Sequence, residues 1–429
     1  MIYLPIVVRI RALACGPLLI FGAFILLPSD QNGGLYNMRN MAVAIDFGTS
    51  KIVTFIAESG SYHRCDIIGA GTVAYDGFLD GYWNAPDEMV DQAIRNAIAA
   101  AEAQAHRQVR DVFIGVPGEF CRVYAIEASV TLQGADPRVT LHDVERVFAQ
   151  ATEEIQPIRG VIIHRSPAWF TVDEGKKTME PIGMKGSTLK AMVSFVVADE
   201  FFLSDLSRRI QAMGISLNGF FSSSVGQALL FLPPEERDRI AVLIDVGYLS
   251  TEVMAVEGDA LIFQKVIAIG GGHITADLAF GLEVNMSAAE QFKRSYSFQI
   301  SGADIGEQRP TPGQPTREEI ARVLEPRVDE LSEFIRDCLD HCGVRLDNWS
   351  NIYLTGGGLA MMTGGRSYLS AQLGRTVRAP SAKAAKFNSP IYSSALGLID
   401  LVFGSLESQE EAQTPLAKLS GFFRKIVKG

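Results

Sequence analysis

The sequence predicts an α/β protein made of two similar halves, and three observations support this prediction. Apolar segments typical of buried strands alternate along the chain with segments of helical periodicity. One pattern also occurs twice: an apolar strand ends in aspartate, glycine follows two positions later, and hydroxyl residues precede another strand. Finally, hydrophobic residues make up 47% and charged residues 21% of the 429 residues, as in folded domains with substantial cores.

The charge and the cysteines restrict the class of ligand and the compartment. A formal net charge of -10 argues against a nucleic-acid partner, because such binding depends on an extended basic surface. An anionic ligand would therefore be held locally, by backbone amides or a few lysines. The five cysteines form no Cys-x-x-Cys pair, which favours a reduced cytosolic compartment.

The repeated pattern predicts two phosphate-binding loops. Glycine lets the backbone approach an anion, and hydroxyls and amides donate hydrogen bonds to phosphate oxygens. The aspartates add hard oxygens for Mg²⁺ or its waters, and we assign this role to Asp46 and Asp245. One such turn would be ordinary, but two copies in the same strand context favour a shared ligand. The candidate residues are Asp46, Gly48, Thr49, Ser50 and Lys51 in the first loop and Asp245, Gly247, Ser250 and Thr251 in the second.

Two glycine clusters follow the second loop. The segment from Ile269 to Asp277 leads from a strand into a helix, whose free amides can bind an anion. The segment from Leu354 to Leu359 follows another predicted strand and opens a further helix. Because both clusters belong to the half that carries Asp245, we expect one cleft between two lobes. The candidate residues here are Gly270, Gly271, Thr275, Thr355, Gly356, Gly357 and Gly358.

In this order, the four segments resemble the nucleotide-binding motifs of the actin, chaperone and sugar kinase ATPase superfamily. Within it, residues 42–401 most resemble the FtsA family, the actin homologues of bacterial cell division. Residues 387–398 are similar to the FtsA segment that follows the adenosine motif, and 289–293 to the family's Ala-Glu-x-x-Lys helix. The resemblance implies a two-lobed actin-like ATPase fold, ATP with Mg²⁺ as cofactors, and Glu290 and Lys293 beside the nucleoside.

The second loop departs from the family pattern. Tyr248 and Leu249 stand where glycines are usual, and Glu252 stands where aspartate is common. Because a Cβ at these positions limits the approach of the backbone, we expect nucleotide binding with at most weak ATPase activity. In-line attack by water needs a positioned polar residue, and we nominate no catalytic residue from the sequence.

The middle of the chain predicts an FtsA-type inserted subdomain at 125–202. It shows alternating apolar residues at 127–132, a helix from Leu141 to Glu154, and strands near 161–164 and 190–197. The predicted organisation around it is a first lobe at 41–124, 203–240 and 386–403, and a second lobe at 241–385 with an outer subdomain at about 281–351.

The two ends differ from the middle. Residues 1–40 contain an apolar run that is too short and too interrupted to span a membrane, and we expect an over-extended gene start or a disordered extension. Residues 404–414 are polar and acidic, which predicts a flexible linker. Residues 415–429 predict an amphipathic helix suited to an anionic membrane, with docking on the domain as the alternative. Its apolar face comprises Leu416, Leu419, Phe422, Phe423, Ile426 and Val427, and its basic face Lys418, Arg424, Lys425 and Lys428.

The resemblance implies the function of a scaffold. Such a protein polymerises with ATP, anchors FtsZ filaments to the cytoplasmic face of the inner membrane at the division septum, and recruits later division proteins. The alternatives are an actin-like adaptor for pilus assembly, a small-molecule kinase of the same superfamily, and a chaperone.

Overall fold

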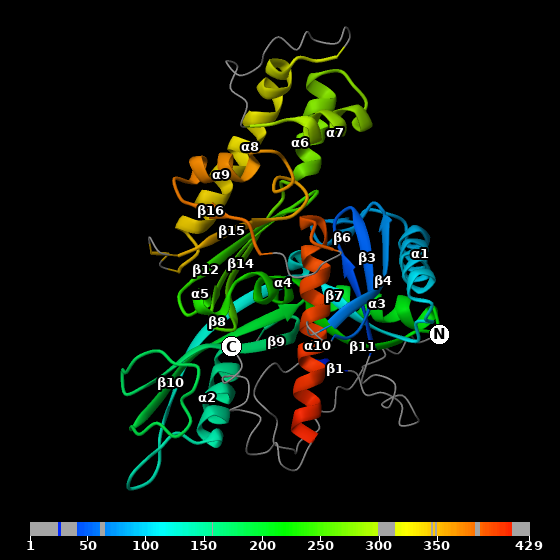
Figure 1. The fold of residues 1–429 in the computed structure, drawn as a ribbon. Coiled ribbons are helices and arrows are strands. Elements are labelled where there is room, and N and C mark those ends of the chain that lie inside the picture. Colours follow the sequence, from blue (N-terminus) through cyan, green and yellow to red (C-terminus); the bar gives the residue numbers. More distant parts are fainter. Residues whose placement is uncertain are drawn as a thin grey trace, which may run out of the picture.

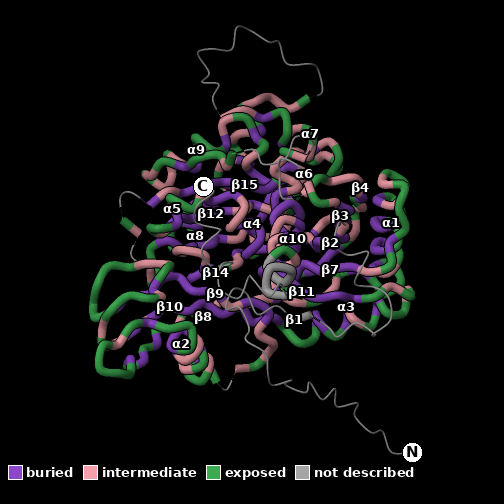
Figure 2. Tube along the Cα trace, turned by 60° about the horizontal axis from the view of Figure 1, so that its bottom comes forward, coloured by how far each residue is buried: buried purple, intermediate pink, exposed green. Residues whose placement is uncertain are grey.

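The computed structural model describes residues 25–26, 41–60, 65–156, 158–298, 314–344, 346–347, 350–381 and 387–413. Two large sheets, a three-stranded sheet and the two-stranded pair β5-β6 organise this part of the chain (Figure 1). Figure 2 shows that buried residues concentrate in the strands, whereas exposed ones lie on the outside of α1 and at the far end of the inserted subdomain. The predicted membrane helix at 415–429 lies outside the described residues.

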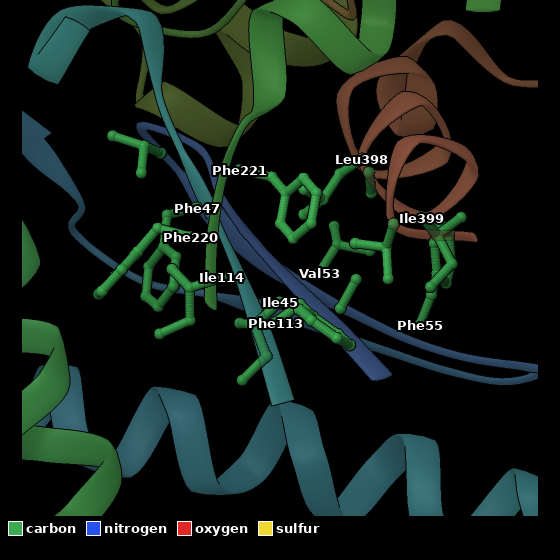
Figure 3. Close-up of a cluster of buried hydrophobic side chains, with 14 of the residues drawn as sticks. Ile45, Phe47, Val53, Phe55, Phe113, Ile114, Phe220, Phe221, Leu398 and Ile399 are labelled. Carbon is green, nitrogen blue, oxygen red and sulfur yellow. The ribbon is translucent and has the colours of Figure 1, made fainter. Parts of the chain in front are cut away.

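A six-stranded sheet with the order β1-β11-β7-β2-β3-β4 forms the first lobe. Strands β2, β3 and β4 form an antiparallel meander, and β7 and β11 run parallel to β2. All of β2 after Met41 is buried, because helices cover both faces of the sheet. Figure 3 shows this core, with Leu398 and Ile399 of α10 beside Val53 and Phe55.

The elements of this lobe have the following bounds. The strands are β1 (Ile25–Leu26), β2 (Met41–Phe47), β3 (Lys51–Ser59), β4 (Cys65–Ala74), β5 (Phe78–Leu79), β6 (Tyr82–Trp83), β7 (Asp111–Val116) and β11 (Ser216–Ser222). The helices are α1 (Asp87–Ala105), α3 (Glu200–Ala212), α4 (Ser223–Phe231), α5 (Pro234–Arg237), η2 (Pro390–Tyr392) and α10 (Ser393–Gln413). Strand β1 places two residues of the predicted N-terminal extension at the edge of the sheet, against β11.

The second lobe repeats this topology. Its five-stranded sheet has the order β14-β13-β12-β15-β16, again an antiparallel meander followed by two parallel strands. Asp46 and Asp245 occupy the same place in the two sheets, near the end of the first meander strand. The repeat that the loops predict is therefore a repeat of whole sheets.

Helices complete the second lobe. The helix α6 packs against α7 and α8, so this helical unit begins before residue 281, the predicted start of the outer subdomain. The bounds are β12 (Ala241–Val246), β13 (Thr251–Glu257), β14 (Ala260–Ile267), β15 (Ile352–Thr355), β16 (Val377–Arg378), α6 (Gly271–Gly281), α7 (Met286–Ser295), α8 (Arg317–Asp340) and α9 (Gly365–Leu373).

The inserted subdomain is a three-stranded antiparallel sheet, β8-β10-β9, with α2 on one face. The predicted helix is confirmed as α2 (Leu141–Glu154), which Thr140 and Asp143 close with a capping box. The remaining elements are η1 (Gly118–Phe120), β8 (Cys121–Thr131), β9 (Val161–Val172) and β10 (Thr188–Ala198). The predicted limits of 125 and 202 are wrong by a few residues: β8 starts earlier, and α3 is one helix whose Phe202 packs into the first lobe's core.

The expected flexible linker at 404–414 is also wrong as far as Gln413. There α10 continues through the polar segment, and Ser405 is buried. The physical reason is that tertiary contacts hold the first turns of α10, and extending an existing helix through Glu, Gln and Ala costs little. Among the described residues, no helix combines the length and the apolar character that a membrane crossing requires.

Candidate functional site

A cavity of about 370 Å³ lies between the two lobes, a size typical of small-molecule sites. Both predicted loops, the two glycine clusters and α7 contribute to its wall. The predicted residues that line it are Asp46, Gly48, Thr49, Ser50, Lys51, Asp245, Gly247, Ser250, Gly271, Glu290, Lys293, Gly356, Gly357 and Gly358. The other predicted residues, Thr251, Gly270, Thr275 and Thr355, are not among those that line it.

The two loops have the same local geometry. The Gly48 amide donates to the Lys51 carbonyl at 2.9 Å, and the Gly247 amide donates to the Ser250 carbonyl at 2.9 Å. The loops also touch across the cleft, where the Leu249 amide donates to the Thr49 hydroxyl at 3.1 Å. They therefore form one continuous surface from both lobes.

Side chains from two helices hold the aspartates at the cavity. The hydroxyls of Ser223 and Ser394 donate to Asp46 Oδ1 at 2.7 and 3.0 Å. The amide of Gln227 donates to Asp245 Oδ2. Sequence reasoning missed all three residues. Ser223 and Gln227 follow no motif, and Ser394 belongs to the FtsA-like segment 387–398 but reaches Asp46 only through the fold.

The helices that carry these side chains, α4 and α10, touch through two glycines. A Cβ on Gly226 would lie 2.5 Å from the Gly397 carbonyl oxygen, and a Cβ on Gly397 would lie 2.2 Å from the Gln227 amide nitrogen. The Gln227 amide also donates to the Ser393 hydroxyl of α10 at 2.8 Å. Because of this close crossing, the side chains that hydrogen-bond to Asp46 and to Asp245 come from two helices in direct contact.

Burial controls the charges of the cavity. It raises the pKa of Asp46, although the hydrogen bonds from the two serines oppose this rise. It also raises the pKa of Asp245 to about 6 and lowers the pKa of Lys51. Lys51 donates to the Ile391 carbonyl at 2.7 Å and places its cation near both carboxyls. Two carboxyls with raised pKa values favour a ligand that carries a further positive charge.

The glycine clusters let three backbone segments meet. Gly356 has a φ of 89°, and a Cβ there would lie 2.1 Å from Asp245 Oδ1. A Cβ on Gly271 would lie 2.6 Å from the Cα of Gly358, whose amide donates to the Val246 carbonyl at 2.7 Å. Side chains at these positions would push the cluster away from the second loop.

The helix α7 supplies a buried lysine that pairs with a partly exposed glutamate. Lys293 is buried and pairs with Glu290 at 2.7 Å. It also donates to the Gly271 carbonyl and to the Thr275 hydroxyl, both at 2.8 Å. Thr275 thus fixes the first glycine cluster from behind, and Thr251 does the same by donating to the Ile269 carbonyl at 2.7 Å.

Two further acids line the cavity. Glu119 follows β7 in η1, and Glu252 belongs to β13. Burial raises the pKa of Glu119 to about 7 and that of Glu252 to about 8. Sequence reasoning missed Glu119, although its place just after a buried strand at the same sheet edge was a usable signal.

Two lobes of equal topology, with paired turns facing across a cleft, define the class of actin-like ATPase-fold proteins. The solved structure of a PilM–PilN type IV pilus biogenesis complex shares this fold, with a TM-score of 0.59 and 20% identity over 85% of this chain and 99% of that chain. The two-lobed actin-like fold predicted from the sequence is thereby confirmed, whereas the predicted C-terminal amphipathic helix lies outside the described residues.

Family models and curated relatives then identify the family. The model "Cell division protein FtsA" matches residues 242–397, and the model "SHS2 domain inserted in FTSA" matches residues 118–197. The chain is 26% identical over 389 residues to the cell division protein FtsA of Pseudomonas aeruginosa, covering 87% of this chain and 91% of that protein. It is 27% identical over 374 residues to the FtsA of Bacillus subtilis, covering 85% and 83%. The chain belongs to the FtsA family and is an actin-like cell-division protein. Family membership favours this function over the pilus adaptor, the kinase and the chaperone.

Proposed function

We propose that the cleft binds ATP together with Mg²⁺. The observation that carries this proposal is the pair of matching turns, Gly48 to Lys51 and Gly247 to Ser250, which meet across the cavity with Lys51 between Asp46 and Asp245. Backbone amides, hydroxyls and a lysine suit phosphate oxygens. A divalent cation would favour the ionised forms of both aspartates and offset the negative charge of the triphosphate.

The coordination we propose for Mg²⁺ uses few protein ligands. Within the described ranges, no group of three or more His, Cys, Asp or Glu could hold a metal ion. Mg²⁺ normally keeps several waters and takes substrate phosphates as ligands, with one or two carboxylates beside them. Asp46 and Asp245 would therefore act on the ion through its waters.

The nucleotide would act as a ligand that stabilises the closed arrangement of the lobes and permits polymerisation. As an FtsA-family protein, the chain would anchor FtsZ filaments to the cytoplasmic face of the inner membrane at the septum and engage later division proteins. The basic amphipathic segment 415–429 would bind the anionic membrane surface. One such helix binds weakly, so a filament that presents many copies would attach firmly.

Co-sedimentation with anionic liposomes tests the tethering role. The full chain with ATP should carry FtsZ into the lipid pellet, and a chain that ends at Thr414 should not. Phe422→Asp, on the apolar face, should fail as the truncation does, whereas Ala417→Asp, on the basic face, should weaken binding much less. Equal recruitment by the full and shortened chains would rule out the tether.

A further inference from the structure

Glu119 and Glu252 meet on the floor of the cleft, from opposite sides of it. Glu119 lies in η1 at the end of β7, and Glu252 lies in β13 of the second lobe. Gly118, which precedes Glu119, packs closely against the Glu252 carboxyl, because a Cβ on Gly118 would lie 2.4 Å from Glu252 Oε1. Neither carboxyl has a part in the binding of phosphate or Mg²⁺ proposed above.

Glu119 lies beside the second phosphate loop. Its carboxylate accepts a hydrogen bond from the side chain of Ser250, and the same cavity wall includes Gly48 and Thr49 of the first loop. A terminal phosphoryl group held between the loops would therefore be next to Glu119. A water between that group and Glu119 would be close to the phosphorus that it must attack, with the carboxylate beside it to take its proton.

The surroundings raise the pKa values of both acids. Burial raises the pKa of Glu119 to about 7, with the Ser250 hydrogen bond opposing and the charge of Asp80 adding. Burial raises the pKa of Glu252 to about 8, and the Glu119 charge contributes to that rise. Tyr75 also faces this group, because the Glu119 charge helps to raise the pKa of its phenol. Both carboxyls therefore titrate in the neutral range, which suits acid–base chemistry.

The other acids of the cavity have different partners. Asp46 and Asp245 accept hydrogen bonds from serine and glutamine and would face the cation. Burial alone would raise the pKa of Glu290, but hydrogen bonds from Lys293, Thr275 and Arg294 lower it, which makes it a weak base. Glu119 is therefore the acid that accepts a hydrogen bond from the second phosphate loop and is basic enough to take a proton, whereas Glu252 has Ser224 and Gln264 as its partners.

We propose that Glu119 is a catalytic residue for slow ATP hydrolysis in this cleft, and that Glu252 is a positioning residue beside it. This inference rests on the proposed binding of ATP. The water oxygen forms a bond to the γ-phosphorus, and the bond from that phosphorus to the β–γ bridging oxygen breaks. ADP leaves with the electron pair of that bond, and the Glu119 carboxylate takes the proton that the water loses.

The test uses the full chain and separates binding from hydrolysis. ATP affinity is measured by titration with Mg²⁺ present, and phosphate release is measured under saturating ATP. Glu119→Gln should lower phosphate release by about 10²-fold, the lower end for loss of a general base, while ATP affinity stays within about threefold. Glu252→Gln, which keeps a neutral side chain of the same size, should reduce phosphate release by less than about tenfold. Glu127→Gln, an exposed position in β8, is the matched control and should change neither quantity.

The pH dependence of phosphate release and a conservative variant distinguish a catalytic Glu119 from a purely structural one. Phosphate release by the unchanged chain should rise as pH increases through about 7, because the base acts in its ionised form. In Glu119→Gln this rise should be absent, and Glu119→Asp should restore part of the activity. The inference is overturned if Glu119→Gln binds ATP and releases phosphate at the unchanged rate, or if the unchanged chain binds ATP and never releases phosphate. Failure of the unchanged chain to bind ATP would instead contradict the proposed function.

Discussion

Replacing Asp245 by asparagine should make the ligand-free protein more stable at alkaline pH and should abolish its binding of ATP with Mg²⁺. The side chain keeps its shape, and its amide oxygen can still accept the hydrogen bond from Gln227. The buried negative charge is lost. Asp245 is thus expected to destabilise the ligand-free fold and to be needed for nucleotide binding.

The size of the gain follows from the pKa of Asp245. Burial raises this pKa from 3.8 to about 6, so the folded state binds the proton more tightly than the unfolded state. The resulting stabilisation is fully present below pH 3.8 and is lost as pH rises through about 6. Two pKa units correspond to about 3 kcal/mol at pH well above 6. Subtracting about 1 kcal/mol for the weaker, uncharged hydrogen bond leaves a net gain of about 2 kcal/mol.

Urea unfolding without nucleotide, between about pH 5 and about pH 8, measures this gain. The difference between Asp245→Asn and the unchanged chain should grow with pH and level off at the alkaline end. Asp66→Asn, an exposed carboxyl in β4, should show no such trend. In a parallel measurement, added ATP and Mg²⁺ should stabilise the unchanged chain and Asp66→Asn but not Asp245→Asn. A variant that is less stable at high pH, or a difference that does not vary with pH, would refute the reasoning.

Two further predictions concern the backbone and the ion pairs that support the cleft. Gly356→Ala should lower the free energy of unfolding by about 2 kcal/mol and weaken ATP binding, because the new Cβ meets both an unfavourable positive φ and Asp245. Thermal unfolding should show a smaller loss for Gly374→Ala, which has a positive φ but open space, and equal losses would argue against the contact. Arg209→Met should cost about 3–5 kcal/mol in urea unfolding, because it leaves the carboxylates of Asp87, Asp91 and Asp205 without their buried partner. Arg208→Met, whose side chain is 60% exposed, should cost under about 1 kcal/mol, and similar losses for the two variants would contradict this assignment.

The repeated lobes and their loops could be predicted from the sequence because their signals are local. A buried strand that ends in Asp46 or Asp245, followed by glycine and hydroxyl residues, encodes a strand and its turn within about ten residues. The signal for the helix α2 is equally local, since Thr140 and the periodic residues after it mark its start and length. The tail of α10 was mistaken for a linker, because the contacts that hold the start of the helix come from α4 and leave no trace in the polar segment itself.

The sequence alone determined that two aspartate loops exist, that glycine clusters accompany them, and that the chain resembles the FtsA family. Only the tertiary structure decided how those loops are held and what else faces the ligand. Ser223 and Gln227 reach Asp46 and Asp245 because α4 crosses α10 at a pair of glycines. Glu119 acquires its raised pKa from burial on the floor of the cleft, which depends on neighbours distant in the chain. Local patterns specify turns, whereas partners and burial depend on which distant segments the packed lobes bring together.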